Sequence, residues 1–369
     1  MFHTILLTAW TLFHLYIVGR ALSLPIFKRP VHRLVLVLAI VILWTSYFLP
    51  GIADRIGAGF ASSWLEQFSM NWLGTSFLLF TCLLIVDLVT LFGILFKKYR
   101  THIRASAFVA GILLSIFALY QGYRAPVVRE YEIRLANLPS KYDDLVLVAV
   151  SDLHVGTFLD ETWLAQRVNQ VNALKPDVVV LLGDFFEGDN RDERKRSMID
   201  LFRKISAPLG VFGVTGNHES YGGLDSTIQF LEEAGVQMLR NQWREPEPGI
   251  VIAGVDDGHG RNQTADAGGK IERALAGRPD SSAVIFLSHR PVGAEKAAAA
   301  GVGLMLCGHT HGGQLWPFYY ISAMYNPLMA GEYVINGMPV IVSRGTGTWG
   351  PRMRLWYPSE ILRIVLKSK

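Results

Sequence analysis

Hydrophobic positions follow two different patterns along the chain. The first 124 residues hold four long apolar runs, whereas later apolar runs are short and alternate with polar segments. A membrane-spanning helix needs about 20 mostly apolar residues, so the long runs predict an all-α transmembrane domain of about four helices. These runs are Phe2–Val18, Leu34–Leu49, Trp72–Phe96 and Ala105–Tyr120. We expect this domain over residues 1–124, a linker over 125–139 and a second domain over 140–369.

The loops between the apolar runs predict their orientation. Lys and Arg are concentrated in the first and third loops, while the second has one: Arg20, Lys28, Arg29 and Arg33; then Arg55; then Lys97, Lys98, Arg100 and Arg104. Loops rich in Lys and Arg remain in the cytoplasm. We therefore expect a multi-pass protein of the cell membrane with an extracytoplasmic second domain. Asp87 lies within the third run, and such a carboxylate is either functional or structural, in which case it faces a polar interior or extends toward one end of the span.

The second domain has the pattern of a layered α/β fold. Its apolar runs read as strands buried on both faces, and Glu161–Leu174 has apolar residues at helical spacing after a capping Asp160. Strands that alternate with helices indicate layers of sheet and helix. The strand candidates are Leu145–Val150, Val178–Leu182, Val211–Val214, Ile250–Val255, Ala283–Leu287, Gly303–Cys307, Pro339–Val342 and Ile361–Val365.

Composition supports a membrane protein and argues against two other classes. Only 18% of the 369 residues are charged, compared with about 25% in soluble domains. The net charge of +4 is small, and the basic residues cluster near the apolar runs, so we expect no nucleic acid duplex as a partner. The two cysteines, Cys82 and Cys307, lack CxxC spacing, which argues against a disulfide framework or a zinc knuckle.

Polar motifs directly follow five of the predicted strands. In open α/β sheets, ligands bind at the carboxyl ends of strands, so the five ends can form one site. Seven side chains could serve as metal ligands there: Asp152, His154, Asp184, Asn217, His289, His309 and His311. Carboxylate, amide and imidazole donors suit Mn, Fe or Zn.

The charges of such a site favour a phosphate guest. Two divalent ions would bring about +4, and the only formal charges among the ligands are the two carboxylates, at about −2. The remaining charge of about +2 attracts a phosphate group. Two metals can stabilise both the attacking and the leaving oxygen of an in-line displacement, and Asp184 has two oxygens with which to bridge them. The predicted cofactors are two divalent ions (Mn, Zn, Fe or Mg).

The order of these motifs resembles that of the calcineurin-like metallophosphoesterase superfamily: D-x-H, G-D, G-N-H-[D/E], H and G-H-x-H. The resemblance covers residues 140–369, and the string from Gly308 to Gln314 is similar to a membrane-associated bacterial branch. The implied fold is a β-sandwich flanked by helices. The implied ligands are Asp152, His154, Asp184 and His311 for one metal, and Asp184, Asn217, His289 and His309 for the other.

The resemblance also implies roles for residues around the metals. Asp184 and His218 would be catalytic, Asn217 and His218 would bind substrate, and His218 would protonate the leaving oxygen. Glu219 follows His218 directly. Many members of the family have Asp three residues after the bridging Asp, where this chain has Glu187, so the role of Glu187 stays open.

The resulting hypothesis is a membrane-anchored, metal-dependent phosphohydrolase for phosphoester or pyrophosphate bonds. Tethering raises the effective concentration of substrates held in the same bilayer, which favours a lipid-linked substrate. The alternatives are an extracytoplasmic phosphodiesterase for soluble nucleotides and a non-catalytic membrane sensor or scaffold. Trp316–Tyr320, with Met324 and Tyr325, is rich in aromatics and is interpreted as core, as an apolar rim beside the site or as an interfacial belt.

Overall fold

The computed structural model describes residues 2–156, 159–187, 192–257 and 267–369. The chain divides into two compact units. The helical unit comprises Met1–Arg124 together with Leu315–Pro317 and Gly350–Trp356. The α/β unit comprises Ala125–Gln314, Phe318–Trp349 and Tyr357–Lys369.

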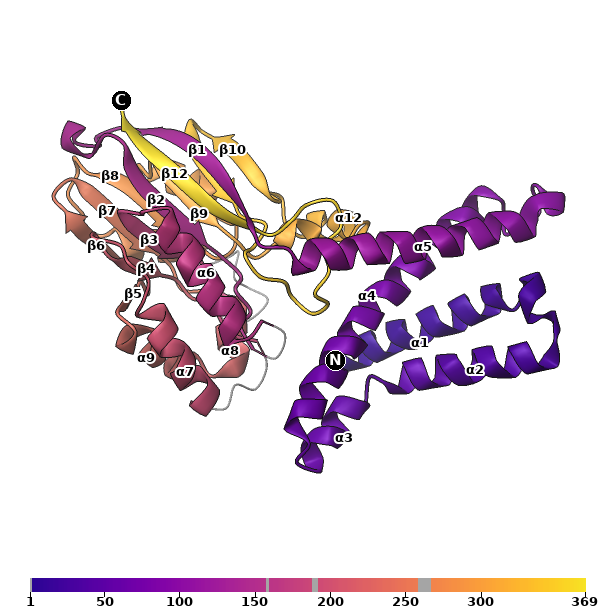
Figure 1. Ribbon diagram of the computed structural model, residues 1–369. Coiled ribbons are helices and arrows are strands. Elements are labelled where there is room, and N and C mark those ends of the chain that lie inside the picture. Colours follow the sequence, from indigo (N-terminus) through magenta and orange to yellow (C-terminus); the bar gives the residue numbers. More distant parts are fainter. Residues whose placement is uncertain (1, 157–158, 188–191, 258–266) are drawn as a thin grey trace. The chain divides into compact units, whose positions relative to one another are not determined.

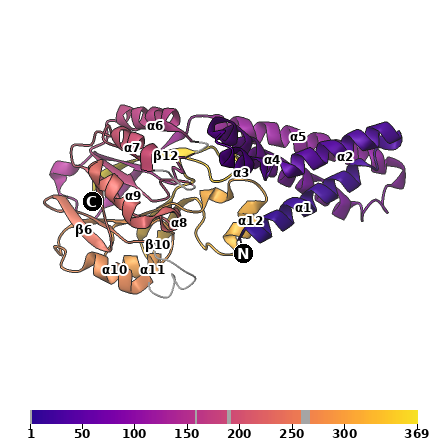
Figure 2. The ribbon, with the colours of Figure 1, turned by 90° about the horizontal axis from the view of Figure 1, so that it is seen from below.

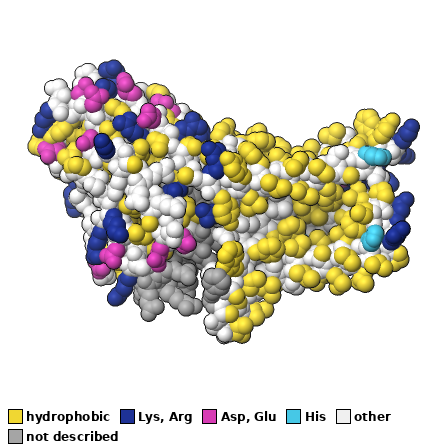
Figure 3. All heavy atoms as spheres, in the orientation of Figure 1, with side chains coloured by type: hydrophobic (Ala, Val, Ile, Leu, Met, Phe, Trp, Pro, Cys, Tyr) yellow, Lys and Arg dark blue, Asp and Glu magenta, His cyan; other side chains and the backbone are white. Residues whose placement is uncertain are grey.

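The helical unit contains helices long and apolar enough to cross a membrane. Among its described residues there are three such helices, and a fourth span exists if the bent pair of α2 and α3 forms one crossing. Large hydrophobic side chains cover much of its surface, and Lys, Arg and His gather at one end (Figure 3). The elements are α1 (Phe2–Ala21), η1 (Pro25–Lys28), α2 (Pro30–Thr45), α3 (Leu49–Arg55), α4 (Gly59–Val89), η2 (Lys97–Tyr99) and α5 (Arg100–Tyr123).

Asp87 is buried inside the helical unit and is surrounded by donors. Its carboxylate lies 2.5 Å from Arg20 Nε and 3.2 Å from Arg104 Nη2. The Tyr16 hydroxyl donates a hydrogen bond to it at 2.5 Å. A lone carboxylate within a membrane span is costly, and here two cations offset that cost. These contacts join α1, α4 and α5.

The α/β unit is built on two six-stranded sheets (Figure 1). The first has the order β1 (Val127–Leu135), β12 (Glu360–Ser368), β2 (Leu145–Val150), β3 (Val178–Leu181), β4 (Val211–Gly213) and β5 (Val236–Met238). The second has the order β10 (Gly331–Ile335), β11 (Met338–Val342), β9 (Leu304–Cys307), β8 (Ala283–Leu287), β7 (Ile250–Gly254) and β6 (Gln242–Glu247). Strands β2 to β5 run parallel in the first sheet, as do β7, β8, β9 and β11 in the second.

The sheets form a sandwich whose outer faces are covered by helices. One core contains side chains of both sheets, including Leu147 and Val180 of the first and Ile285 and Leu306 of the second. A second core lies between the first sheet and its helices, and a third lies between the second sheet and its helices. The two sets of helices are on opposite sides of the unit (Figure 2). The helices are α6 (Glu161–Ala173), α7 (Asp192–Phe202) and α9 (Leu224–Glu233) on one side, and α10 (Ala267–Leu275) and α11 (Ala294–Ala299) on the other. This arrangement confirms the expected β-sandwich flanked by helices.

Local sequence explains most of these elements. Each of the eight predicted strands has a counterpart in the two sheets, and Asp160 caps α6 by accepting a hydrogen bond from Trp163 N at 2.9 Å. The pattern did not reveal β1, β5, β6 or β10. β1 lies within residues 125–139, where we expected a linker. Among the described strands it pairs with β12 alone, at the edge of the sheet, and it is rich in charged residues. Its sequence therefore resembles a polar connection.

Candidate metal centre

The carboxyl ends of five parallel strands carry the predicted site residues. The loop after β2 holds Asp152 and His154, and the loop after β3 holds Asp184. Two backbone hydrogen bonds fasten these loops together, from Asp152 N to Gly183 O and from His154 N to Asp184 O, both at 3.0 Å. β4 leads to α8 (Asn217–Gly222), which begins with Asn217 and His218; β8 leads to His289; and β9 leads to His309 and the turn η4 (His311–Gly313).

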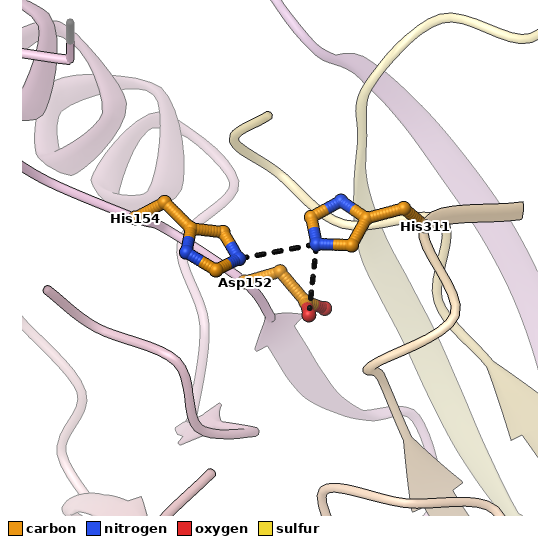
Figure 4. A group of neighbouring side chains, drawn as sticks. All are labelled: Asp152, His154 and His311. Carbon is orange, nitrogen blue, oxygen red and sulfur yellow. Dashed lines mark hydrogen bonds and ion pairs between the residues drawn. The ribbon is translucent and has the colours of Figure 1, made fainter. Parts of the chain in front are cut away.

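Asp152, His154 and His311 form one group of converging donor atoms (Figure 4). His311 Nε2 lies 3.1 Å from His154 Nε2 and 3.4 Å from the Asp152 carboxylate. Asp152 is held in place because its two oxygens accept the backbone N–H of His309 at 3.1 and 3.2 Å. Two imidazole nitrogens and a buried carboxylate directed at one point form a donor set that fits a divalent cation.

Asp184, His289 and His309 form a second group. His289 Nε2 lies 3.2 Å from Asp184 Oδ2, and His309 Nδ1 lies 3.2 Å from the same His289 nitrogen. Asn217 Oδ1 is also 3.2 Å from His289 Nε2. The other ring nitrogen of His289 donates to the carbonyl of Leu182 at 2.7 Å. That bond fixes the tautomer and leaves Nε2 free to act as a ligand.

Asp184 lies between the two groups. Its Oδ2 is 3.7 Å from His154 Nε2 on one side and 3.2 Å from His289 Nε2 on the other. Its Oδ1 accepts the backbone N–H of His218 at 2.9 Å. A Cβ on Gly216 would lie 2.1 Å from the Asp184 carboxylate and 2.5 Å from its backbone nitrogen. Only glycine at position 216 therefore allows this close approach.

Five of the candidate ligands have strained backbones. Their φ angles lie between 45° and 74°, in the left-handed region that residues other than glycine rarely adopt. The five are Asp152, His154, Asp184, His309 and His311. Each such residue costs about 1–3 kcal/mol and persists only where its surroundings impose it, typically at functional sites. The strain therefore distinguishes this cluster from an ordinary set of buried polar side chains.

Glu187, whose role the sequence left open, holds two of the histidines. Its carboxylate lies 2.7 Å from His154 Nδ1 and 3.1 Å from His218 Nδ1. Burial alone would raise the pKa of Glu187, but its hydrogen bonds with the two histidines outweigh burial and lower the pKa to about 2. Burial alone would lower the pKa of His218, but Glu187 and Asp184 raise it overall. Glu187 thus directs His154 Nε2 at the first group and favours the protonated form of His218.

Glu219 is hydrogen-bonded to the backbone of the loops that follow β3 and β4. Its carboxylate accepts three backbone N–H groups, from Gly216 at 2.6 Å, Phe185 at 2.8 Å and Asp184 at 3.0 Å. Sequence analysis assigned Glu219 no role. It lies three residues after Gly216, the residue that precedes α8, which is the Glu position of a capping box, and this spacing could have identified it.

Comparison with known proteins gives one consistent family. The calcineurin-like phosphoesterase model matches residues 145–313. The chain is 31% identical to a transmembrane protein with metallophosphoesterase domain from Danio rerio, over 83% of this chain and 74% of that protein. It is 30% identical to an uncharacterized metallophosphoesterase from Campylobacter jejuni, over 84% of this chain and 83% of the relative. It is 32% identical to an uncharacterized metallophosphoesterase from Aquifex aeolicus, over 66% of this chain and 92% of the relative.

Proposed function

Because the chain belongs to the calcineurin-like metallophosphoesterases, we propose that it hydrolyses phosphoester or pyrophosphate bonds of a lipid-linked substrate. The observation that carries this proposal is the position of Asp184 between two groups of donor atoms. A phosphoesterase acts on a phosphorylated substrate, and the apolar helices are long enough to span a membrane.

The two donor groups fit two divalent ions. One ion would be held by Asp152, His154, Asp184 and His311, and the other by Asp184, Asn217, His289 and His309. The mixture of carboxylate, amide and imidazole is compatible with Mn, Zn, Fe or Mg. When bound, the ions supply positive charge that attracts phosphate and stabilises the oxygens that enter and leave.

His218 is placed to donate a proton to the leaving oxygen. Its Nδ1 is hydrogen-bonded to Glu187, and in this proposal Nε2 faces the substrate. That nitrogen is 4.0 Å from Asp184 Oδ2, and the side chain is 15% exposed, so a substrate can reach it. Because the pKa of His218 is raised, the imidazolium persists nearer to neutral pH, as a general acid requires. Asn217 directs its oxygen at His289, and its amide N–H groups can donate to a phosphate oxygen.

Two features support a lipid-linked substrate on the outer side of the membrane. Anchoring the enzyme in the bilayer raises its encounter rate with lipids of that bilayer. The first and third loops are rich in Lys and Arg, which favours a cytoplasmic location for both loops. The fourth apolar run would then lead outward, so the α/β unit that follows it would be extracytoplasmic. A carboxy-terminal reporter that is active only outside the cytoplasm should be active. Activity of a reporter confined to the cytoplasm would reverse the orientation.

The substrate proposal is tested with the purified full chain in detergent micelles. We expect a higher kcat/KM for lipid phosphates and lipid pyrophosphates than for bis(p-nitrophenyl) phosphate or nucleotides. Asp184→Asn keeps the shape of the side chain and should abolish turnover. Asp200→Asn, at an exposed ion pair with Arg203, is the matched control and should retain it. Preference for soluble nucleotides would favour the soluble phosphodiesterase, and metal binding without turnover on either class would favour a sensor.

A further inference from the structure

An uncharged segment follows the candidate ligand His311. No Asp, Glu, Lys, Arg or His occurs between His311 and Glu332. Within this segment, α12 (Phe318–Ala323) and the residues after it expose large apolar and aromatic side chains. We call these the α12 surface: Phe318, Tyr320, Ile321, Met324 and Tyr325. Met324 is 77% exposed and Tyr325 is 80% exposed, so these residues do not form the core that was one interpretation of their sequence.

The chain reaches α12 directly from the membrane helices. Leu315–Pro317 belongs to the helical unit, where Leu315 is buried in a cluster with Leu78 of α4 and Ala118 of α5. Phe318 is the next residue after Pro317. One peptide bond spans only about 3.8 Å between Cα atoms, so α12 begins beside a segment that is packed among apolar helices.

The position of Leu315 along the helices follows from its contact with α4. The ion pair of Asp87 and Arg104 marks one end of the bundle. Leu315 packs beside Gly74 of α4, which precedes Asp87 by 13 residues, so at 1.5 Å per residue it lies about 20 Å from the ion pair. The hydrocarbon core of a bilayer is about 30 Å thick. Leu315 is therefore far from the charged end, and the chain leaves the helices within reach of the opposite lipid interface.

Composition identifies lipid as the occupant of the α12 surface. Exposed apolar patches usually mark an interaction site. Tyr and Trp are enriched where a bilayer meets water, because their rings are apolar and carry a polar group. The residues one peptide bond away pack among helices that are apolar enough to cross a membrane, so a bilayer is an apolar phase that this segment can meet without any further partner.

The α12 surface is also tied to the metal centre. Gly313, in the turn that carries His311, has φ of +74°, and a Cβ there would lie 2.4 Å from Tyr319 Cα. α12 therefore packs against the turn with no space for a side chain. We propose that the α12 surface inserts into the lipid interface and so holds the His311 turn beside lipid headgroups. This inference goes beyond the proposed function and does not require a lipid-linked substrate.

Fluorescence quenching tests the insertion without any turnover. Bimane is attached at Met324→Cys or Tyr325→Cys in the full chain, with Cys82→Ser to remove the partly exposed cysteine; Cys307 is buried. The matched control is Glu232→Cys, an exposed position on α9. The protein is reconstituted in phosphatidylcholine and phosphatidylglycerol vesicles with brominated acyl chains.

We expect brominated lipid to quench Met324→Cys and Tyr325→Cys at least about five-fold more than Glu232→Cys, since bromine quenches only at contact. Aqueous iodide should give the opposite order. If iodide quenches all three positions equally and brominated lipid quenches none, the α12 surface is in water and the inference is overturned. An inserted surface in a protein that prefers soluble nucleotides would support this inference and contradict the lipid substrate, so the two failures are distinguishable.

Discussion

Glu219 offers a direct test of how the metal centre is held together. Its carboxylate accepts N–H groups from Gly216, Phe185 and Asp184, and the residue is buried. Glu219→Gln preserves the shape but leaves one oxygen. If that oxygen keeps the bonds with Gly216 and Asp184, the new amino group faces the N–H of Phe185, and two donors oppose each other. The loop that carries Asp184 should then loosen.

The size of the effect follows from these three bonds. A buried donor without an acceptor costs about 1–3 kcal/mol, and each of the two remaining bonds loses about 1 kcal/mol when its acceptor becomes neutral. Removing a buried carboxylate near Asp184 offsets part of this loss, because burying a charge is itself unfavourable. A net cost of about 2 kcal/mol at the site corresponds to a roughly 30-fold weaker metal affinity. Changes in residues that support metal ligands typically cost 10–100-fold.

The assay is a titration of activity with Mn²⁺ on the metal-depleted full chain in detergent. Glu219→Gln should need a roughly 30-fold higher Mn²⁺ concentration for half-maximal activity, with little change in size-exclusion behaviour. Glu232→Gln, at an exposed position of α9, should titrate as wild type. If Glu219→Gln saturates at the wild-type concentration, the three hydrogen bonds do not position the Asp184 loop and our reasoning fails.

Three further changes address other contacts. Glu187→Gln should lower activity about 10–100-fold, and because Glu187 raises the pKa of His218, activity that depends on protonated His218 should be lost at a lower pH than in wild type, as a pH–rate profile would show. Gly313→Val places a Cβ against the backbone of α12 at positive φ and should cost about 1–3 kcal/mol, measured by thermal unfolding and activity. Asp87→Leu leaves Arg104 buried without its carboxylate and should destabilise the helical unit by about 3–5 kcal/mol, measured as a lower Tm in detergent.

Each of these changes has a control and an outcome that contradicts it. An unshifted alkaline limb in Glu187→Gln would show that Glu187 does not control the protonation of His218. Gly313→Ala should be milder than Gly313→Val, and a wild-type Tm for both would contradict the close packing. Adding Arg104→Met to Asp87→Leu should recover part of the lost stability, because an apolar pair replaces the unpaired cation; no recovery would mean that the ion pair is not the cause.

The sequence was sufficient for much of the architecture. Apolar runs long enough to span a bilayer and short runs buried on both faces are local patterns, so they predicted the helical region and eight strands. β1 was missed because its charged sequence is typical of an edge strand and because its partner β12 lies far away in the sequence, with Val127 paired to Glu360. Pairing over such a separation is decided by the fold and leaves no local signal.

For the metal centre, the sequence determined which donors are available and that each follows a strand. That information is local, since it needs only residue types and the ends of apolar runs. The tertiary structure alone decided that Asp184 lies between two groups of histidines, that Glu187 holds both His154 and His218, and that Glu219 binds three backbone N–H groups. These contacts depend on left-handed loop conformations and on two sheets that bring strand ends together. Neither can be read from residues that are neighbours in the chain.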